Sequence, residues 1–125
     1  MNKLVSRQII EINRKLSGNC SNEKTIKKLN AILLEIYSKD KEGFYIFRDS
    51  VSKAAKLACE LYNQKPFANK NLATAIYTAF ILLQVNGIAL TGYDNDLKTL
   101  QTHIINNDNF AVENWINKYN HDNMT

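Results

Sequence analysis

The sequence predicts an all-α protein, a bundle of about six helices around one buried central helix. Apolar residues recur at helical spacing along nearly the whole chain. The stretch 72–85 is apolar on all sides, which is typical of a helix surrounded by its neighbours. Residues 45–47 are a candidate strand, but no second segment is suited to pair with it. These observations favour a single all-α domain over residues 1–125.

The first three helices are expected to be separated by a glycine and by a polar segment. The first should end before Gly18, and Ser21 is expected to cap the second. The polar segment at 38–43 should end the second helix, and a third should run from about residue 44 to residue 62. The residues expected to face inward are Val5, Ile9, Ile12 and Leu16, then Ile26, Leu29, Leu33 and Ile36, then Phe47, Val51, Ala54, Ala58 and Leu61.

The central helix is expected over residues 71–85, and the Asn86-Gly87 pair should end it. A fifth helix should open over residues 93–96, and Asp108 can cap a sixth. The residues expected to face inward here are Leu97, Leu100 and Ile104, then Val112, Trp115, Ile116 and Tyr119.

The net charge of +4 is unevenly distributed along the chain. Residues 1–63 carry 12 basic and 7 acidic side chains, whereas residues 64–125 carry 4 basic and 5 acidic ones. Only three of the 16 basic residues are arginine, the residue preferred for phosphate and base recognition. Nucleic-acid binding is therefore not expected, and a salt-sensitive affinity for DNA or RNA would be the sign of it.

The sequence favours a cytoplasmic protein without a membrane segment. The N-terminus lacks the apolar core of a signal peptide, and the stretch 72–85, of 14 residues, is too short to cross a bilayer. Cys20 and Cys59 lack a metal-binding spacing and are expected to be reduced thiols.

The segment before the central helix, NQKPFANKNLATA at 63–75, has the composition of an anion-binding loop. Pro66 should hold Lys65 in an extended conformation, and Phe67 can anchor the loop in the core. The free N–H groups of the first helical turn and the helix dipole would attract an anion, with Lys65 and Lys70 beside it.

A purely structural interpretation of this segment is also open. In that interpretation Phe67 is a core anchor, Asn69 or Asn71 caps the helix, and the two lysines are solvated.

The stretch KPFANKNLATAIYTAFILLQVNGI resembles the signature of the Fic/Doc family, in particular the short death-on-curing (Doc) toxins. Their motif reads His-x-Phe-x-(Asp/Glu)-(Gly/Ala)-Asn-(Lys/Gly)-Arg, followed by an apolar helix that ends in Asn-Gly. The resemblance implies an all-α fold and transfer of AMP or phosphate from a nucleotide to a hydroxyl group of a target protein. For Doc toxins it implies elongation factor Tu as the target and a small antitoxin as the partner.

Most polar positions of that motif are changed in this chain. Lys65 stands where the family has its catalytic histidine, the general base of the reaction. A lysine side chain has an ordinary pKa of about 10.4, so it is a poor base at neutral pH. Asn69 stands where the family has the carboxylate that helps to hold Mg²⁺, so the resemblance implies a weakened magnesium site. Ala73 stands where the family has its phosphate-clamping arginine.

Other positions agree with the motif or keep a binding role open. Phe67 matches the motif phenylalanine, and Asn71 matches the asparagine that contacts phosphate. Lys70 replaces the small residue that lets the backbone approach the phosphates. The loop could therefore still hold an anion through Lys70, Asn71 and Asn69.

The resemblance thus implies a degenerate Fic/Doc-like protein, a pseudoenzyme that binds a protein or a nucleotide such as ATP, linked to a toxin–antitoxin system. The alternative is an active Doc-type toxin that transfers phosphate or AMP with non-standard residues, Lys65 acting as the base. An antitoxin or a host protein would be the partner in either case.

Overall fold

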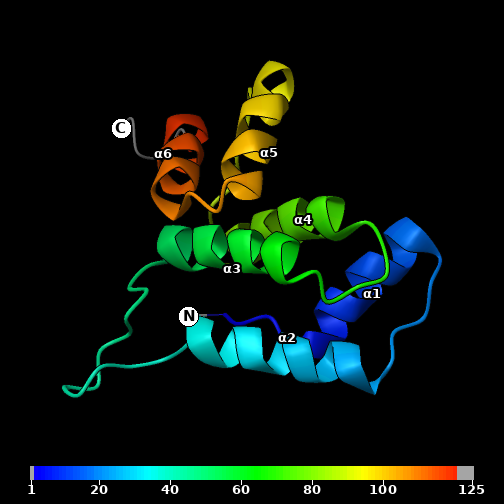
Figure 1. The fold of residues 1–125 in the computed structure, drawn as a ribbon. Coiled ribbons are helices and arrows are strands. Elements are labelled where there is room, and N and C mark those ends of the chain that lie inside the picture. The colour runs from blue at the N-terminus through cyan, green and yellow to red at the C-terminus, as the bar shows by residue number, and fades with distance from the viewer. Residues whose placement is uncertain (1, 121–125) are drawn as a thin grey trace.

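The computed structural model describes residues 2–120, and within them the chain is all-α, which confirms the predicted fold class. Figure 1 shows three layers, with α1 and α2 on one side, α3 and α4 in the middle, and α5 and α6 on the other side. No helix in this range is both long and apolar enough to cross a bilayer. The elements are α1 (Ser6–Ser17), α2 (Glu23–Ile36), α3 (Ser50–Gln64), α4 (Asn71–Val85), the 3₁₀ turn η1 (Asp94–Asp96), α5 (Leu97–Ile105) and α6 (Asn109–Tyr119).

Helix α3, rather than α4, is the most completely surrounded helix. It packs against α2, α4, α5 and α6, whereas α4 packs mainly against α3 and α1. The small side chains of Ala54, Ala55 and Ala58 are fully buried and let the neighbouring helices approach closely. One face of α4 stays open to solvent, as the 55% exposure of Tyr77 on that face shows. The prediction of a helical bundle is therefore confirmed, but its centre is the α3–α4 pair and not α4 alone.

The third helix begins six residues later than the sequence pattern predicted. Asp49 caps it: the carboxylate accepts from the Ser52 N–H at 2.7 Å, and the Ser52 hydroxyl accepts from the Asp49 N–H at 3.2 Å. The segment 37–49 before it is an extended loop with an isolated bridge between Lys39 and Tyr45. Local capping therefore overrides the helical spacing of the apolar residues 44–47.

Lys53, in the first turns of α3, ties this loop to the bundle. Its side chain is fully buried, its Nζ donates a hydrogen bond to the Phe47 carbonyl, and the same nitrogen lies 4.2 Å from the centre of the Tyr45 ring. Burial lowers the pKa of Lys53. A buried lysine of α3 is thus the anchor of the 37–49 loop.

The ends of the other helices agree only in part with the sequence predictions. The Asp108 carboxylate accepts from the Ala111 N–H at 3.0 Å, as predicted for the sixth helix. The second helix is capped by Asn22 instead of Ser21, because the Asn22 side chain accepts from the Thr25 N–H at 3.0 Å. The predicted fifth helix opens only at Leu97, after η1. The buried residues of the first two helices are Ile9 and Asn13, then Thr25, Leu29, Ile32 and Ile36. Val5 and Ile26 are exposed and Ile12 and Leu16 are only half-buried, so these four do not face the core as predicted.

The two cysteines are both free thiols in very different surroundings. Cys20 is exposed, whereas Cys59 of α3 is fully buried. Burial raises the pKa of the Cys59 thiol to about 12, so that it is protonated and protected at neutral pH. Modification of Cys59 by a thiol reagent therefore reports exposure of α3 and checks the folding of any variant.

Candidate functional site

An open pocket of about 400 Å³ lies beside the loop that joins α3 to α4. We call it the loop pocket. Four of the residues singled out from the sequence line it, namely Lys65, Lys70, Asn71 and Ala73. The full lining is Tyr62, Lys65, Lys70, Asn71, Leu72, Ala73, Ile76 and Gln101. Residues close in the sequence are thus brought around one hollow that also includes a side chain of α5.

Lys65 ends α3 in the left-handed conformation, with φ 47° and ψ 61°. The predicted extended conformation before Pro66 is therefore wrong. The chain must reverse direction between α3 and α4, and a left-handed residue is the usual way to end a helix. Burial of Pro66 and Phe67 holds the loop in place, and the Thr25 hydroxyl donates to the Pro66 carbonyl at 2.8 Å. The prediction that Phe67 anchors the loop is confirmed.

Lys70 immediately precedes α4 and is also left-handed, with φ 60° and ψ 28°. No side chain caps this helix, so the proposed capping by Asn69 or Asn71 is wrong. The first intrahelical bond runs from the Thr74 N–H to the Lys70 carbonyl at 2.9 Å. By helix geometry the N–H groups of residues 71–73 lack an intrahelical acceptor and form the positive end of the helix dipole.

The side chain of Asn71 has a structural task in the loop. Its Oδ1 accepts from the Phe67 N–H and its Nδ2 donates to the Phe67 carbonyl, both at 3.0 Å. Contact of this amide with a phosphate would require one of these bonds to open. Asn69 lies outside the pocket lining, and its carbonyl accepts from Asn13 Nδ2 of α1 at 3.0 Å. Of the predicted phosphate ligands, Lys70 is the most available.

The two lysines of the pocket differ in their freedom. Lys65 Nζ donates to the Tyr62 carbonyl at 3.2 Å and lies 3.7 Å from the centre of the Tyr62 ring. This cation–π contact holds the ammonium group at the pocket wall. Lys70 is exposed and takes part in none of the ion pairs found between residues 2 and 120.

The chemistry available in the pocket is attraction of an anion. Its lining contains two lysines, amides and apolar side chains, with neither a carboxylate nor an imidazole. Within the described range no three His, Cys, Asp or Glu side chains are grouped so that they could hold a metal ion. The site thus offers positive charge and hydrogen-bond donors but no conventional general base.

The sequence reasoning did not assign four of the lining residues to a site, namely Tyr62, Leu72, Ile76 and Gln101. Tyr62 precedes Lys65 by three residues and Ile76 follows Leu72 by four, so helical spacing could have found them once the pocket was located. Gln101 comes from α5, and nothing in the linear pattern connects it with the loop.

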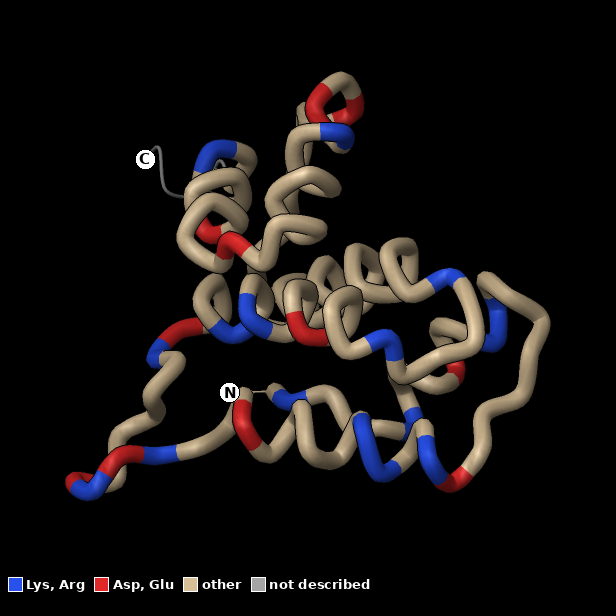
Figure 2. The backbone as a smooth tube through the Cα atoms, viewed as in Figure 1, with Lys and Arg blue, Asp and Glu red and all other residues tan. Residues whose placement is uncertain are grey.

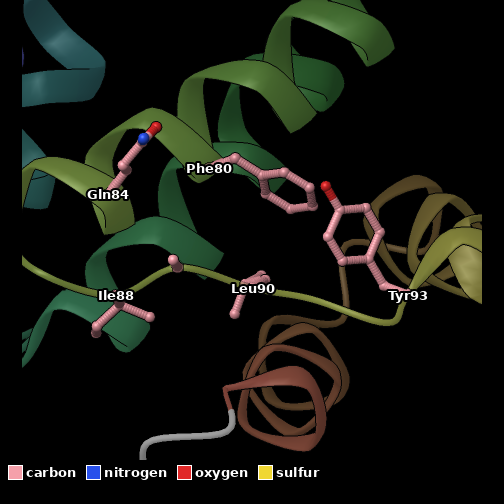
Figure 3. A pocket seen from close by; sticks show the side chains of 6 residues that line it. Phe80, Gln84, Ile88, Leu90 and Tyr93 are labelled. Carbon is pink, nitrogen blue, oxygen red and sulfur yellow. The ribbon is translucent and has the colours of Figure 1, made fainter.

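Two other hollows lack the features of this site. Figure 3 shows the first, of about 160 Å³, where Phe80 and Tyr93 lie side by side and Ile88 and Leu90 line the wall; its lining holds no charged residue. The second, of about 290 Å³, lies between α5 and α6 and includes Asp96 and His103. The Asp96 carboxylate there accepts from the Tyr119 hydroxyl at 2.5 Å, which joins the start of α5 to the end of α6.

Comparisons with known proteins identify no relative of this chain. No family model, no curated protein and no solved structure matches it. The Fic/Doc resemblance therefore remains a prediction from the sequence.

Proposed function

We propose that this chain binds a nucleotide, with ATP as the first candidate, through its phosphate groups at the loop pocket, and does not transfer them. One observation carries the proposal: Lys65, Lys70 and the N-terminus of α4 converge on a hollow that no acidic side chain lines. Ammonium groups and a helix N-terminus favour an anion, and about 400 Å³ suits a small molecule. In terms of the Fic/Doc resemblance the protein is a pseudoenzyme linked to a toxin–antitoxin system.

The residues that line the pocket support the proposed lack of transfer activity. Lys65, at the position of the family histidine, already donates to Tyr62 and is held against its ring. Ala73 cannot replace a guanidinium group, and the lining offers no carboxylate for Mg²⁺. Binding is therefore expected to be about as tight without Mg²⁺ as with it.

Calorimetric titration of the protein with ATP, with and without Mg²⁺, tests the proposal. We expect saturable binding that Lys70→Ala weakens about fivefold and that added salt weakens further. Lys41→Ala is the matched control, because Lys41 is an exposed lysine of the 37–49 loop at the opposite end of α3. Absence of binding at millimolar ATP, or an equal effect of both variants, would exclude a nucleotide at this pocket and leave a protein partner.

A gain-of-function variant tests whether only the reacting groups are missing. Lys65→His with Ala73→Arg places an imidazole and a guanidinium group in the same pocket. If the scaffold is Fic/Doc-like, this double variant should transfer label from ATP to proteins of a host lysate, whereas the wild type should not. Transfer by the wild type that Lys65→Ala abolishes would instead support the active-toxin alternative.

The left-handed conformation of Lys70 predicts that replacing this lysine by glycine stabilises the fold, although the same change weakens ATP binding. Glycine adopts φ 60° without the steric cost that lysine has there. Lys70→Gly should therefore raise the free energy of unfolding by up to about 1 kcal/mol while it weakens ATP binding. Urea denaturation followed by the fluorescence of the single tryptophan measures the first effect, and a less stable variant would show that the lysine side chain stabilises the loop.

A further inference from the structure

Helix α4 departs from the pattern of an ordinary surface helix, because it buries two polar side chains and exposes a large aromatic one. Its two threonines, Thr74 and Thr78, are fully buried, whereas Tyr77 on the outer side is 55% exposed. Thr74 is satisfied there, because its hydroxyl accepts from Asn13 Nδ2 of α1 at 3.0 Å. Figure 2 shows the whole of α4 without a charged residue. Surface helices normally present their polar side to solvent, so the outer face of α4 has the character of an interface.

This outer face borders a groove between α1 and α4. The groove has a volume of about 280 Å³ and is lined by Ile12, Lys15, Leu16, Tyr77 and Ile81, which define the α1–α4 groove. The apolar members are spaced four residues apart on each helix, so each helix contributes one short apolar row to the border of the groove. Such rows accept the side chains of a third helix.

The charge at the groove indicates the kind of occupant. Lys15 is its one charged lining residue and is exposed. Glu11, four residues earlier on α1, also attracts Lys15, but its carboxylate is paired with Arg14, so positive charge remains in excess beside the groove. A second copy of this chain related by a two-fold axis through the groove would bring Lys15 close to its own counterpart, which is unfavourable. A carboxylate beside an apolar stripe would instead complement both features.

We propose that the α1–α4 groove binds an amphipathic helix of a partner protein, with an apolar stripe on Tyr77 and Ile81 and acidic side chains next to Lys15. This binding is separate from that of the nucleotide, because Lys15 and Tyr77 do not line the loop pocket. An experiment that excludes ATP binding at the loop pocket therefore does not exclude helix binding at the α1–α4 groove, and the reverse also holds.

Fluorescence anisotropy with three labelled synthetic helical peptides tests this proposal. The first has leucines at i, i+3, i+4 and i+7 flanked by glutamates, the second has lysines in place of the glutamates, and the third has serines in place of the leucines. We expect the wild type to bind the first peptide at least tenfold more tightly than either other. Lys15→Glu should reverse the preference between the first two peptides, and Tyr77→Ser should weaken the first at least tenfold.

Lys41→Glu provides the control of equal charge change outside the groove, and it should leave all three affinities unchanged. Protection of Cys59 from thiol reagents shows that each variant is folded. Equal binding of the acidic and basic peptides, or no binding at millimolar peptide, would overturn the proposal. So would sedimentation of the wild type as a dimer that Tyr77→Ser dissociates, or adsorption to anionic vesicles that Tyr77→Ser abolishes.

Discussion

Lys53→Ala should lower the free energy of unfolding by about 3 kcal/mol. The Lys53 side chain is among the largest that are fully buried, so its truncation leaves a cavity beneath the 37–49 loop. It also leaves the Phe47 carbonyl without the ammonium donor that satisfies it. Relief of a buried charge offsets part of this loss. Urea denaturation followed by the fluorescence of Trp115, which is buried, measures the change.

Lys53→Met separates the two contributions. It restores most of the buried volume but not the hydrogen bond, so we expect a loss of no more than about 1 kcal/mol if packing dominates. A loss as large as that of Lys53→Ala would show instead that the bond to Phe47 holds the loop. Hydrogen exchange should show that the backbone amides of the 37–49 loop are less protected in both variants than in the wild type.

The difference in stability between the wild type and Lys53→Met should change with pH in a definite direction. Burial lowers the pKa of Lys53 in the folded protein, so the folded state binds its proton less tightly than the unfolded chain does. The cost of the buried charge is complete below the lowered pKa and disappears as pH rises toward the unfolded value of about 10.4. The wild type should therefore gain stability relative to Lys53→Met as the pH is raised in that direction, and a constant difference would contradict this.

Asn13→Ala should have the second largest effect, a loss of about 2 to 3 kcal/mol. Asn13 is 2% exposed, and its Nδ2 donates to both the Thr74 hydroxyl and the Asn69 carbonyl, each at 3.0 Å. The variant therefore leaves polar atoms on α4 and on the loop without a partner. These bonds hold Asn69 and Thr74, which directly neighbour Lys70 and Ala73 of the pocket lining, so ATP affinity should fall together with stability.

Ser17→Ala is the matched control for Asn13. The Ser17 hydroxyl donates to Asn13 Oδ1 at 3.2 Å on the same helix, and its removal does not affect the contacts to α4 and the loop. We expect a loss below about 1 kcal/mol and unchanged ATP binding. Equal effects of the two variants would mean that Asn13 stabilises only α1.

The helices were predictable because their signals are local. Helical spacing and the caps at Gly18 and Asp108 lie within a few residues of the structure that they specify. The start of α3 was not predictable from this spacing, because Phe44 and Phe47 continue the helical pattern. The helix instead begins after Asp49, which forms a capping pair with Ser52. The centre of the bundle was also misassigned, because an apolar pattern on all sides of α4 does not state which side is covered.

The local features of the candidate site were also predictable from the sequence, whereas those that depend on the folded backbone and on helix packing were not. Lys65, Lys70 and Ala73 lie within nine residues of one another, so their meeting at one pocket could be expected from a short loop entering a helix. The engagement of the Asn71 amide by Phe67 depends on the backbone of the turn, which the sequence pattern did not reveal. Gln101 depends on the packing of α5 and lies beyond any local rule.

The two left-handed lysines that bound the loop, with φ 47° and 60°, place stability and charge in opposition. Laboratory evolution under heat alone should replace them early, by glycine or asparagine, because both residues relieve the backbone there. Such a thermostable lineage would lose the positive charge of the pocket while keeping its shape. Selection for nucleotide retention should preserve the lysines, so the two evolution experiments would separate what the loop does for folding from what it does for a ligand.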